Sequence, residues 1–191
     1  MINRKYPSAL AAVLAASALM AASHGAMAAV ICNNTPISIP NNIDGVYINF
    51  VTGTTGTSSG AVPGFDFDPY AGGADGMNFY FGGGADANNG AVFDGTIYPV
   101  LANGTVIGAA STFALGTADT TMTAWRAGTT GFLGVRFTNE ATSAANFGWV
   151  NLTTTAGTGF PATVNSYCYD NTGADIMAGT TPVSLQSFSV D

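Results

Sequence analysis

Positive charge is scarce in this sequence of 191 residues. Lys and Arg total four and His one, against 11 Asp and Glu, which gives a formal net charge of −7. Arg4, Lys5 and His24 lie near the N-terminus, so the chain beyond residue 28 has no Lys and no His and keeps only Arg126 and Arg136. So few cations cannot neutralise phosphate groups, which excludes nucleic acid and anionic membrane surfaces as partners.

The first 28 residues have the three parts of a secretion signal. Arg4 and Lys5 supply the positive start, residues 9–22 form an uncharged Ala-rich run, and Ala26-Met27-Ala28 offers the small residues that a signal peptidase recognises. A transmembrane anchor needs about 20 strongly apolar residues, and this run is shorter and less apolar. We therefore expect a cleaved signal peptide over residues 1–28 and a secreted or cell-surface protein, with the periplasm as the alternative, that is not an integral membrane protein.

Residues 29–191 then form a single domain. Removing 28 residues from 191 leaves 163, an ordinary domain size, and two cations against 11 acids give it a net charge of −9. The two cysteines, Cys32 and Cys168, lie near the two ends of this domain. Because exported proteins fold in an oxidising compartment, we predict a Cys32–Cys168 disulfide; the alternative is two free buried thiols.

The apolar residues of this domain alternate, and Gly, Thr, Asn and Pro interrupt the chain every few residues. This pattern predicts strands rather than helices. Asn103-Gly104 is a strong hairpin signal between two of the expected strands. The spacing predicts an all-β fold, a single antiparallel β-sandwich of jelly-roll-like type. The expected strands are residues 46–51, 77–81, 96–101, 105–107, 132–137, 147–152, 162–169 and 183–190.

The lack of His and Lys removes most catalytic chemistry. Gly56-Thr57-Ser58-Ser59-Gly60 matches the G-x-S-x-G pattern of hydrolases, but no histidine can take the serine proton. Lysine-activated serine, the phosphate-binding P-loop and imidazole metal sites are excluded in the same way. Ten Asp and Glu140 remain, so carboxylate chemistry is left, and the enzyme considered is a glycosidase that works with carboxylates alone.

Asp66 and Asp68 are the candidate site residues. They lie on one side of an extended chain in Phe65-Asp66-Phe67-Asp68. Three uses fit them: hydrogen bonds within turns, a calcium site completed by oxygens of neighbouring loops, or catalysis. The loop residues that could complete a calcium site are Asp75, Asp86, Asn88 and Asn89. We expect no obligatory cofactor, with calcium as a possibility at Asp66 and Asp68, and we expect residues 170–175 to form a hairpin turn.

Aromatic side chains could form a flat platform for sugars, because rings stack on the apolar faces of sugar units. The candidates are Tyr70, Tyr80, Trp125 and Trp149. Trp149 lies between Phe147 and Val150 in an expected strand, which favours a place in the core.

Four blocks of the sequence resemble a group of secreted bacterial proteins of unknown function. The blocks are G-F-L-G-V-R-F at 131–137, F-G-W-V at 147–150, Y-C-Y-D at 167–170 and I-M-A-G at 176–179. The resemblance covers residues 131–179 well and residues 44–81 more loosely, and it implies export without assigning an activity or a site residue. Many members of that group carry a C-terminal PEP-CTERM sorting segment. The sequence ends without such a segment, so we expect free secretion.

Together these observations predict a non-enzymatic, exported, acidic β-sandwich that serves as a surface, matrix or adhesion component. The alternative is a carbohydrate-binding module, with or without calcium. The expected partners are glycans or other cell-surface proteins, and the oligomeric state stays open.

Overall fold

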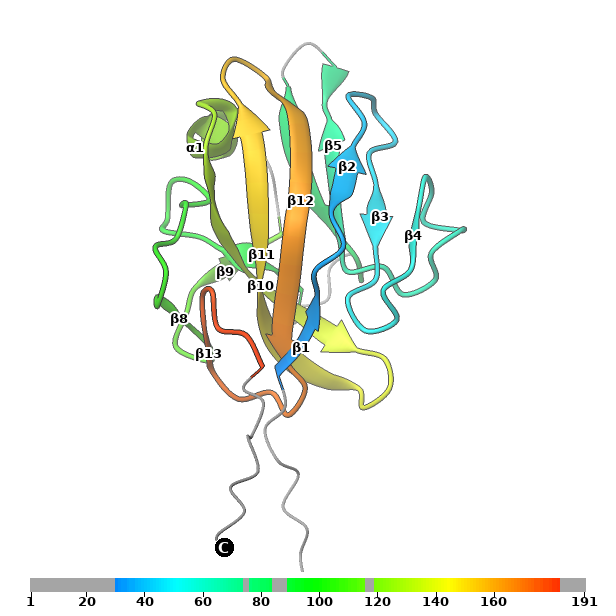
Figure 1. Ribbon diagram of the computed structural model, residues 1–191, viewed down its shortest axis with the longest axis vertical. Helices are drawn as coiled ribbons and strands as arrows, with labels where there is room; N and C mark the ends of the chain where they lie inside the picture. Colours follow the sequence, from blue (N-terminus) through cyan, green and yellow to red (C-terminus); the bar gives the residue numbers. More distant parts are fainter. Residues whose placement is uncertain (1–29, 74–75, 84–88, 116–118, 183–191) are drawn as a thin grey trace, which may run out of the picture.

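The computed structural model describes residues 30–73, 76–83, 89–115 and 119–182, which form three antiparallel sheets (Figure 1). The larger sheet has the order β1-β12-β11-β10-β7-β9, and β2 also pairs with β12. The smaller sheet has the order β4-β3-β5-β6, and β13 pairs with β8 in a third sheet. The expected signal peptide and the expected strand 183–190 lie outside the described residues, as do Asp75, Asp86 and Asn88.

The strands of the larger sheet are β1 (Val30–Asn33), β2 (Ile37–Ile39), β7 (Gly90–Val92), β9 (Phe113–Ala114), β10 (Thr130–Asn139), β11 (Ala144–Thr155) and β12 (Gly159–Asp170). The smaller sheet contains β3 (Tyr47–Ile48), β4 (Thr55–Gly56), β5 (Phe67–Ala71) and β6 (Met77–Phe81). The two-stranded sheet contains β8 (Val106–Ile107) and β13 (Ile176–Met177).

The main core lies between the larger and the smaller sheet. Leu133, Val135 and Phe137 alternate along β10 and point inward, where they join one cluster with Ile48 and Phe67 of the smaller sheet. Each such side chain contributes about 1.5–3 kcal/mol when it is fully buried. Two sheets that share one apolar core in this way form a β-sandwich-like domain, which confirms the all-β prediction.

A second apolar cluster covers part of the opposite face of the larger sheet. Phe147 and Trp149 of β11 point away from the main core and pack with Ile107 and Ile176 of the two-stranded sheet. Trp149 is buried, and its indole Nε1–H donates to the carbonyl of Thr180 at 3.2 Å. The expected core position of Trp149 is therefore confirmed, although it belongs to this second cluster.

The longest predicted strands are confirmed, whereas the expected strand at 46–51 is shorter. Val46, Ile48 and Phe50 are all buried, as their alternation predicts, but pairing ends after Ile48. The chain turns at Asn49, whose side-chain oxygen accepts a hydrogen bond from the Thr52 N–H at 2.8 Å and whose carbonyl accepts one from the Gly53 N–H. Asn favours such turns because its side chain bonds nearby backbone.

The expected hairpin around Asn103-Gly104 is wrong. A turn does form there, with the Thr105 N–H bonded to the Ala102 carbonyl, but the two flanking segments do not pair with each other. Leu101 bridges to Phe132, and β8 pairs with β13. Long-range partners on β10 and β13 thus override the local signal.

Residues 170–175 form a turn but not the expected hairpin. The Asp170 side-chain oxygen accepts hydrogen bonds from the backbone N–H groups of Thr172 and Ala174. The strand that follows, β13, pairs with β8 rather than returning along β12. The sequence therefore predicted correctly that Asp170 stabilises a turn, but it did not predict that β13 pairs with β8.

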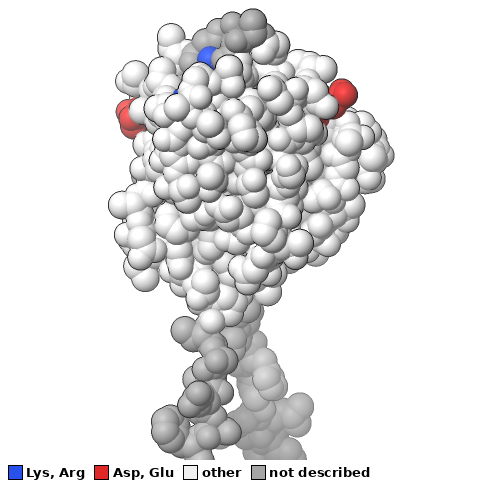
Figure 2. Space-filling model, turned by 45° about the horizontal axis from the view of Figure 1, so that its top comes forward, with Lys and Arg blue, Asp and Glu red and all other residues white. Residues whose placement is uncertain are grey.

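Charged side chains are sparse on the described surface. Figure 2 shows a broad face that is almost entirely uncharged, with acidic side chains at two of its edges. Arg126, at the end of α1 (Thr123–Arg126), donates from Nε to the Met77 carbonyl and from its terminal nitrogen to Asn78 Oδ1. Arg136 places its guanidinium 4.6 Å from the centre of the Phe113 ring. Both cations therefore support neighbouring strands.

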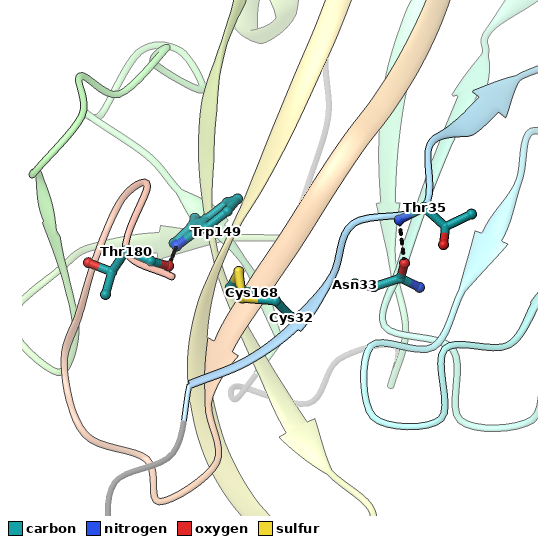
Figure 3. The surroundings of a disulfide bond; sticks show 6 residues. All are labelled: Cys32, Asn33, Thr35, Trp149, Cys168 and Thr180. Carbon is teal, nitrogen blue, oxygen red and sulfur yellow. Dashed lines mark hydrogen bonds between the residues drawn. A yellow bond between two sulfur atoms is a disulfide. The ribbon is translucent and has the colours of Figure 1, made fainter. Parts of the chain in front are cut away.

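The predicted disulfide between Cys32 and Cys168 is confirmed. The two residues lie opposite each other in the pairing of β1 with β12, and they are 136 positions apart in sequence. Figure 3 shows the bond between these strands, with Trp149 to one side and Asn33 to the other. The bond therefore fixes the first described strand to the edge of the larger sheet.

Candidate functional site

The outer face of the smaller sheet carries a row of aromatic and polar side chains. Phe67 points into the core, so the next residue on β5, Asp68, points to the outer face. Asp68 lies directly opposite Tyr80 of β6, and Tyr47 of β3 precedes Ile48, the partner of Phe67. The register of three strands thus places Tyr47, Asp68 and Tyr80 side by side.

Three rings gather on this outer face. The Tyr47 and Phe65 rings meet edge to face with centroids 4.7 Å apart, and the Phe65 and Tyr80 centroids are 5.5 Å apart. Tyr80 is 46% exposed, whereas its neighbours Phe79 and Phe81 point into the core, as strand alternation requires. We call Tyr47, Phe65 and Tyr80 the aromatic face. Tyr80 is exposed on this face, and Tyr47 and Phe65 are half-buried.

Asp68 lies beneath the aromatic face. The residue is only 2% exposed, and its carboxyl accepts hydrogen bonds from the Val46 N–H and the Tyr47 hydroxyl, yet its Oδ1 atom has no hydrogen-bond partner. Burial raises the pKa of Asp68 to about 7, against an ordinary value of 3.8. Asp68 Oδ1 is therefore an unpartnered carboxyl oxygen that is closed off from solvent beneath the aromatic face.

The close packing around Asp68 requires a glycine in the segment that precedes β3. Gly45 has a φ of +57°, and a Cβ atom there would lie 2.3 Å from Asp68 Oδ1. Only glycine combines this conformation with such a close approach. Gly45 thus fixes how near the chain before β3 comes to the carboxyl.

Asp66 is buried in a different environment. Its Oδ2 atom accepts a hydrogen bond from the Phe50 N–H at 2.8 Å, which holds the turn after β3 against the start of β5. Burial raises the pKa of Asp66 to about 8, and the nearby Glu140 adds to this rise. Asp66 and Asp68 therefore have a structural use, but each bonds a backbone group distant in sequence rather than one within its own turn.

The described residues contain no group of three or more His, Cys, Asp or Glu side chains that could hold a metal ion. Asn89, a predicted calcium neighbour, donates to the Gly82 carbonyl and accepts a bond from the Thr138 N–H. Its amide therefore ties two strands together. Calcium binding at Asp66 and Asp68 stays a prediction.

The structure corrects the expected aromatic platform. Trp125 is fully buried in the main core, where it packs edge to face with Phe79. Of the four expected rings, Tyr80 is exposed and Tyr70 is half-buried. Tyr47 and Phe65 were not expected at such a site. The alternation of residues 46–51 does place Tyr47 opposite the core, but which strand lies beside it depends on the tertiary fold.

No family model, curated protein or solved structure matches this chain. Within the ranges that the structure describes, no helix has the length and apolar character needed to cross a bilayer. The geometry of the site therefore provides the basis for a functional assignment.

Proposed function

We propose that this protein is an exported, non-enzymatic β-sandwich that acts at the cell surface or in an extracellular matrix by binding neutral glycans. The observation that carries the proposal is the aromatic face, in which the exposed Tyr80 ring and the half-buried Tyr47 and Phe65 rings gather on the smaller sheet. Such a group of rings offers the flat apolar surface on which the faces of sugar units stack.

The charge of the chain favours neutral glycans. Beyond residue 28 the sequence holds two cations against 11 acids. Arg126 and Arg136 contact neighbouring strand and ring groups, and neither belongs to the aromatic face. Anionic polymers would meet repulsion without a compensating cation.

Export is supported by the three-part N-terminal segment and by the disulfide, because structural disulfides persist in oxidising compartments. The absence of His and Lys beyond residue 28 supports a non-enzymatic role. The separate hydrogen bonds of Asp66 and Asp68 support it further, since a glycosidase needs two carboxyls that flank one bond.

Replacing Tyr80 with alanine is expected to weaken glycan binding about tenfold, which corresponds to about 1.4 kcal/mol for the loss of one stacking ring. Tyr80→Phe keeps the ring and should retain most of the affinity. Met177→Ala removes a comparably exposed apolar side chain from the two-stranded sheet and should leave binding unchanged. A glycan array identifies the ligand, and calorimetric titration of the three variants measures the effect.

Several outcomes would contradict this proposal. Failure to bind any neutral glycan on the array would remove its basis, and so would equal affinities of Tyr80→Ala and the unaltered protein. Turnover of a polysaccharide that is lost in Asp68→Asn would replace binding with catalysis. The same titration, repeated with added calcium and then with chelator, tests whether calcium assists binding. If neither the affinity nor the melting temperature changes, calcium-assisted binding is excluded.

A further inference from the structure

A concave site lies at the edge of the sandwich, and none of the aromatic-face residues lines it. The cavity has a volume of about 360 Å³ and lies between β1 and the turn that follows β3. Asn33, Asn34, Thr35, Thr52 and Tyr167 contribute polar groups to it, and Phe50 contributes a ring. None of the residues that line it is charged. The two sites share no residue.

The pairing of β1 with β12 determines which side chains reach this cavity. Cys32 points to the outer face of the larger sheet, so its neighbour Asn33 points to the opposite side, as Figure 3 shows. Asn33 lies opposite Tyr167 in the register, and its Nδ2 donates to the Tyr167 hydroxyl at 3.2 Å. The Asn33 Oδ1 atom accepts from the Thr35 N–H at 2.8 Å, which fixes the amide orientation.

The groups fixed in this way still have hydrogen-bonding capacity. An amide nitrogen carries two protons, and the bond to Tyr167 uses one of them. That bond occupies a lone pair of the Tyr167 oxygen and leaves the phenol proton to be donated. Burial raises the pKa of Tyr167 above its ordinary value, so this proton stays in place at neutral pH.

The floor of the cavity is aromatic. The Phe50 and Tyr167 rings pack with centroids 4.9 Å apart, and both residues are 3% exposed. Because both rings are buried, the cavity meets a ligand chiefly through its neutral hydrogen-bonding groups, which suit a ligand with many hydroxyl groups. The absence of cations from the lining, in a chain of net negative charge, disfavours anions.

We propose that this cavity binds a single uncharged sugar unit, such as the end of a glycan chain. A concave site of this size accepts one unit end-on, whereas the aromatic face suits the side of a chain. The proposal shares its ligand class with the aromatic face but does not depend on that site.

Gly53 provides a direct test, because it borders the cavity. Its φ is +71°, and an added Cβ atom would lie 3.7 Å from both Asn33 Nδ2 and the Tyr167 oxygen. Gly53→Asn therefore places an amide where the sugar would bond, and Asn tolerates this backbone conformation better than other side chains. The matched control is Gly73→Asn, at a φ of +65° with no atom within 4 Å of the added Cβ.

The experiment titrates the full exported domain with glucose, galactose and N-acetylglucosamine, and with glucuronate as the charged arm, while backbone amide signals are followed by NMR. We expect at least one neutral sugar to shift the amides of Asn33, Thr52 and Tyr167 with a dissociation constant in the millimolar range, and glucuronate to bind more weakly. Gly53→Asn should weaken binding at least tenfold, and Gly73→Asn should not. Tyr167→Phe, which keeps the ring, should weaken it several-fold.

The proposal is overturned if none of the three neutral sugars shifts these amides, or if Gly53→Asn binds as well as Gly73→Asn while both have unchanged melting curves. Tyr80→Ala separates the two sites. If the cavity binds and the aromatic face does not, Tyr80→Ala leaves both the Asn33, Thr52 and Tyr167 shifts and the affinity for glycans unchanged. The reverse pattern leaves the aromatic face as the sole glycan site.

Discussion

Replacing Cys32 and Cys168 together with alanine is expected to lower the free energy of unfolding by about 5 kcal/mol. The bond joins residues 136 positions apart, so it closes nearly all of the described domain into one loop. Such a closure removes much of the conformational freedom of the unfolded chain. Because domains of this size are stable by only about 5–15 kcal/mol, the loss brings the protein close to unfolding.

Urea denaturation of the oxidised protein, the reduced protein and the double variant measures this effect. The reduced protein and the double variant should agree to within about 1 kcal/mol, because both lack the same constraint. Thr35→Ala, an exposed change in the segment that follows β1, serves as the control and should alter the free energy by less than about 0.5 kcal/mol. Equal stability of the oxidised and reduced proteins would contradict the loop-closure explanation.

The second large effect concerns pH. Burial raises the pKa of Asp66 to about 8, while in the unfolded chain the pKa is near the ordinary 3.8. Between these values the folded state holds a proton that the unfolded state has released, so the free energy of unfolding falls as the pH rises. The shift sets a ceiling of about 6 kcal/mol on the loss from pH 4 to pH 8. Asp68, with a pKa of about 7, acts in the same direction.

Asp66→Asn is therefore expected to stabilise the protein by a few kcal/mol at pH 8 and to change it little at pH 4. Asparagine resembles the protonated acid, and its side-chain oxygen can still accept the bond from the Phe50 N–H. Denaturation curves across this pH range test the effect. A variant that is less stable than the unaltered protein at pH 8 would show that the ionised carboxylate is the native form.

Asp94→Asn is the matched control for this experiment. Asp94 is exposed, and hydrogen bonds from the backbone N–H groups of Ile97 and Thr96 lower its pKa. Its contribution to stability is present above the unfolded pKa of about 3.8 and is lost as the pH falls through the lower folded value. Asp94→Asn should thus leave the slope between pH 4 and pH 8 unchanged.

The alternation of apolar residues in the sequence predicted the strands that keep one face on a core. The alternation in residues 132–137, 147–152 and 162–169 predicted β10, β11 and β12, because each of these strands has one face on a core. The two cysteines of an exported chain predicted the disulfide on chemical grounds alone. The same alternation identified Val46, Ile48 and Phe50 as core residues even where the strand itself was shorter.

The local sequence pattern did not predict which strands pair with each other. Asn103-Gly104 forms its turn, yet β8 pairs with β13, some 70 residues further along the chain. Sequence spacing carries little information about such a choice, because it depends on which distant edge buries the adjoining apolar side chains best. The burial of Trp125 likewise depends on a contact between residues distant in sequence, because Trp125 packs on Phe79 of β6.

The sequence by itself determined the chemistry of this protein: a scarcity of cations, a lack of His and Lys beyond residue 28, an all-β fold and one disulfide. Only the tertiary structure decided where that chemistry is presented. The aromatic face exists because β3, β5 and β6 bring Tyr47, Phe65 and Tyr80 together, and the edge cavity exists because β1 lies opposite the turn after β3. Both are assembled from residues distant in sequence, and such proximity arises only when the sheets pack.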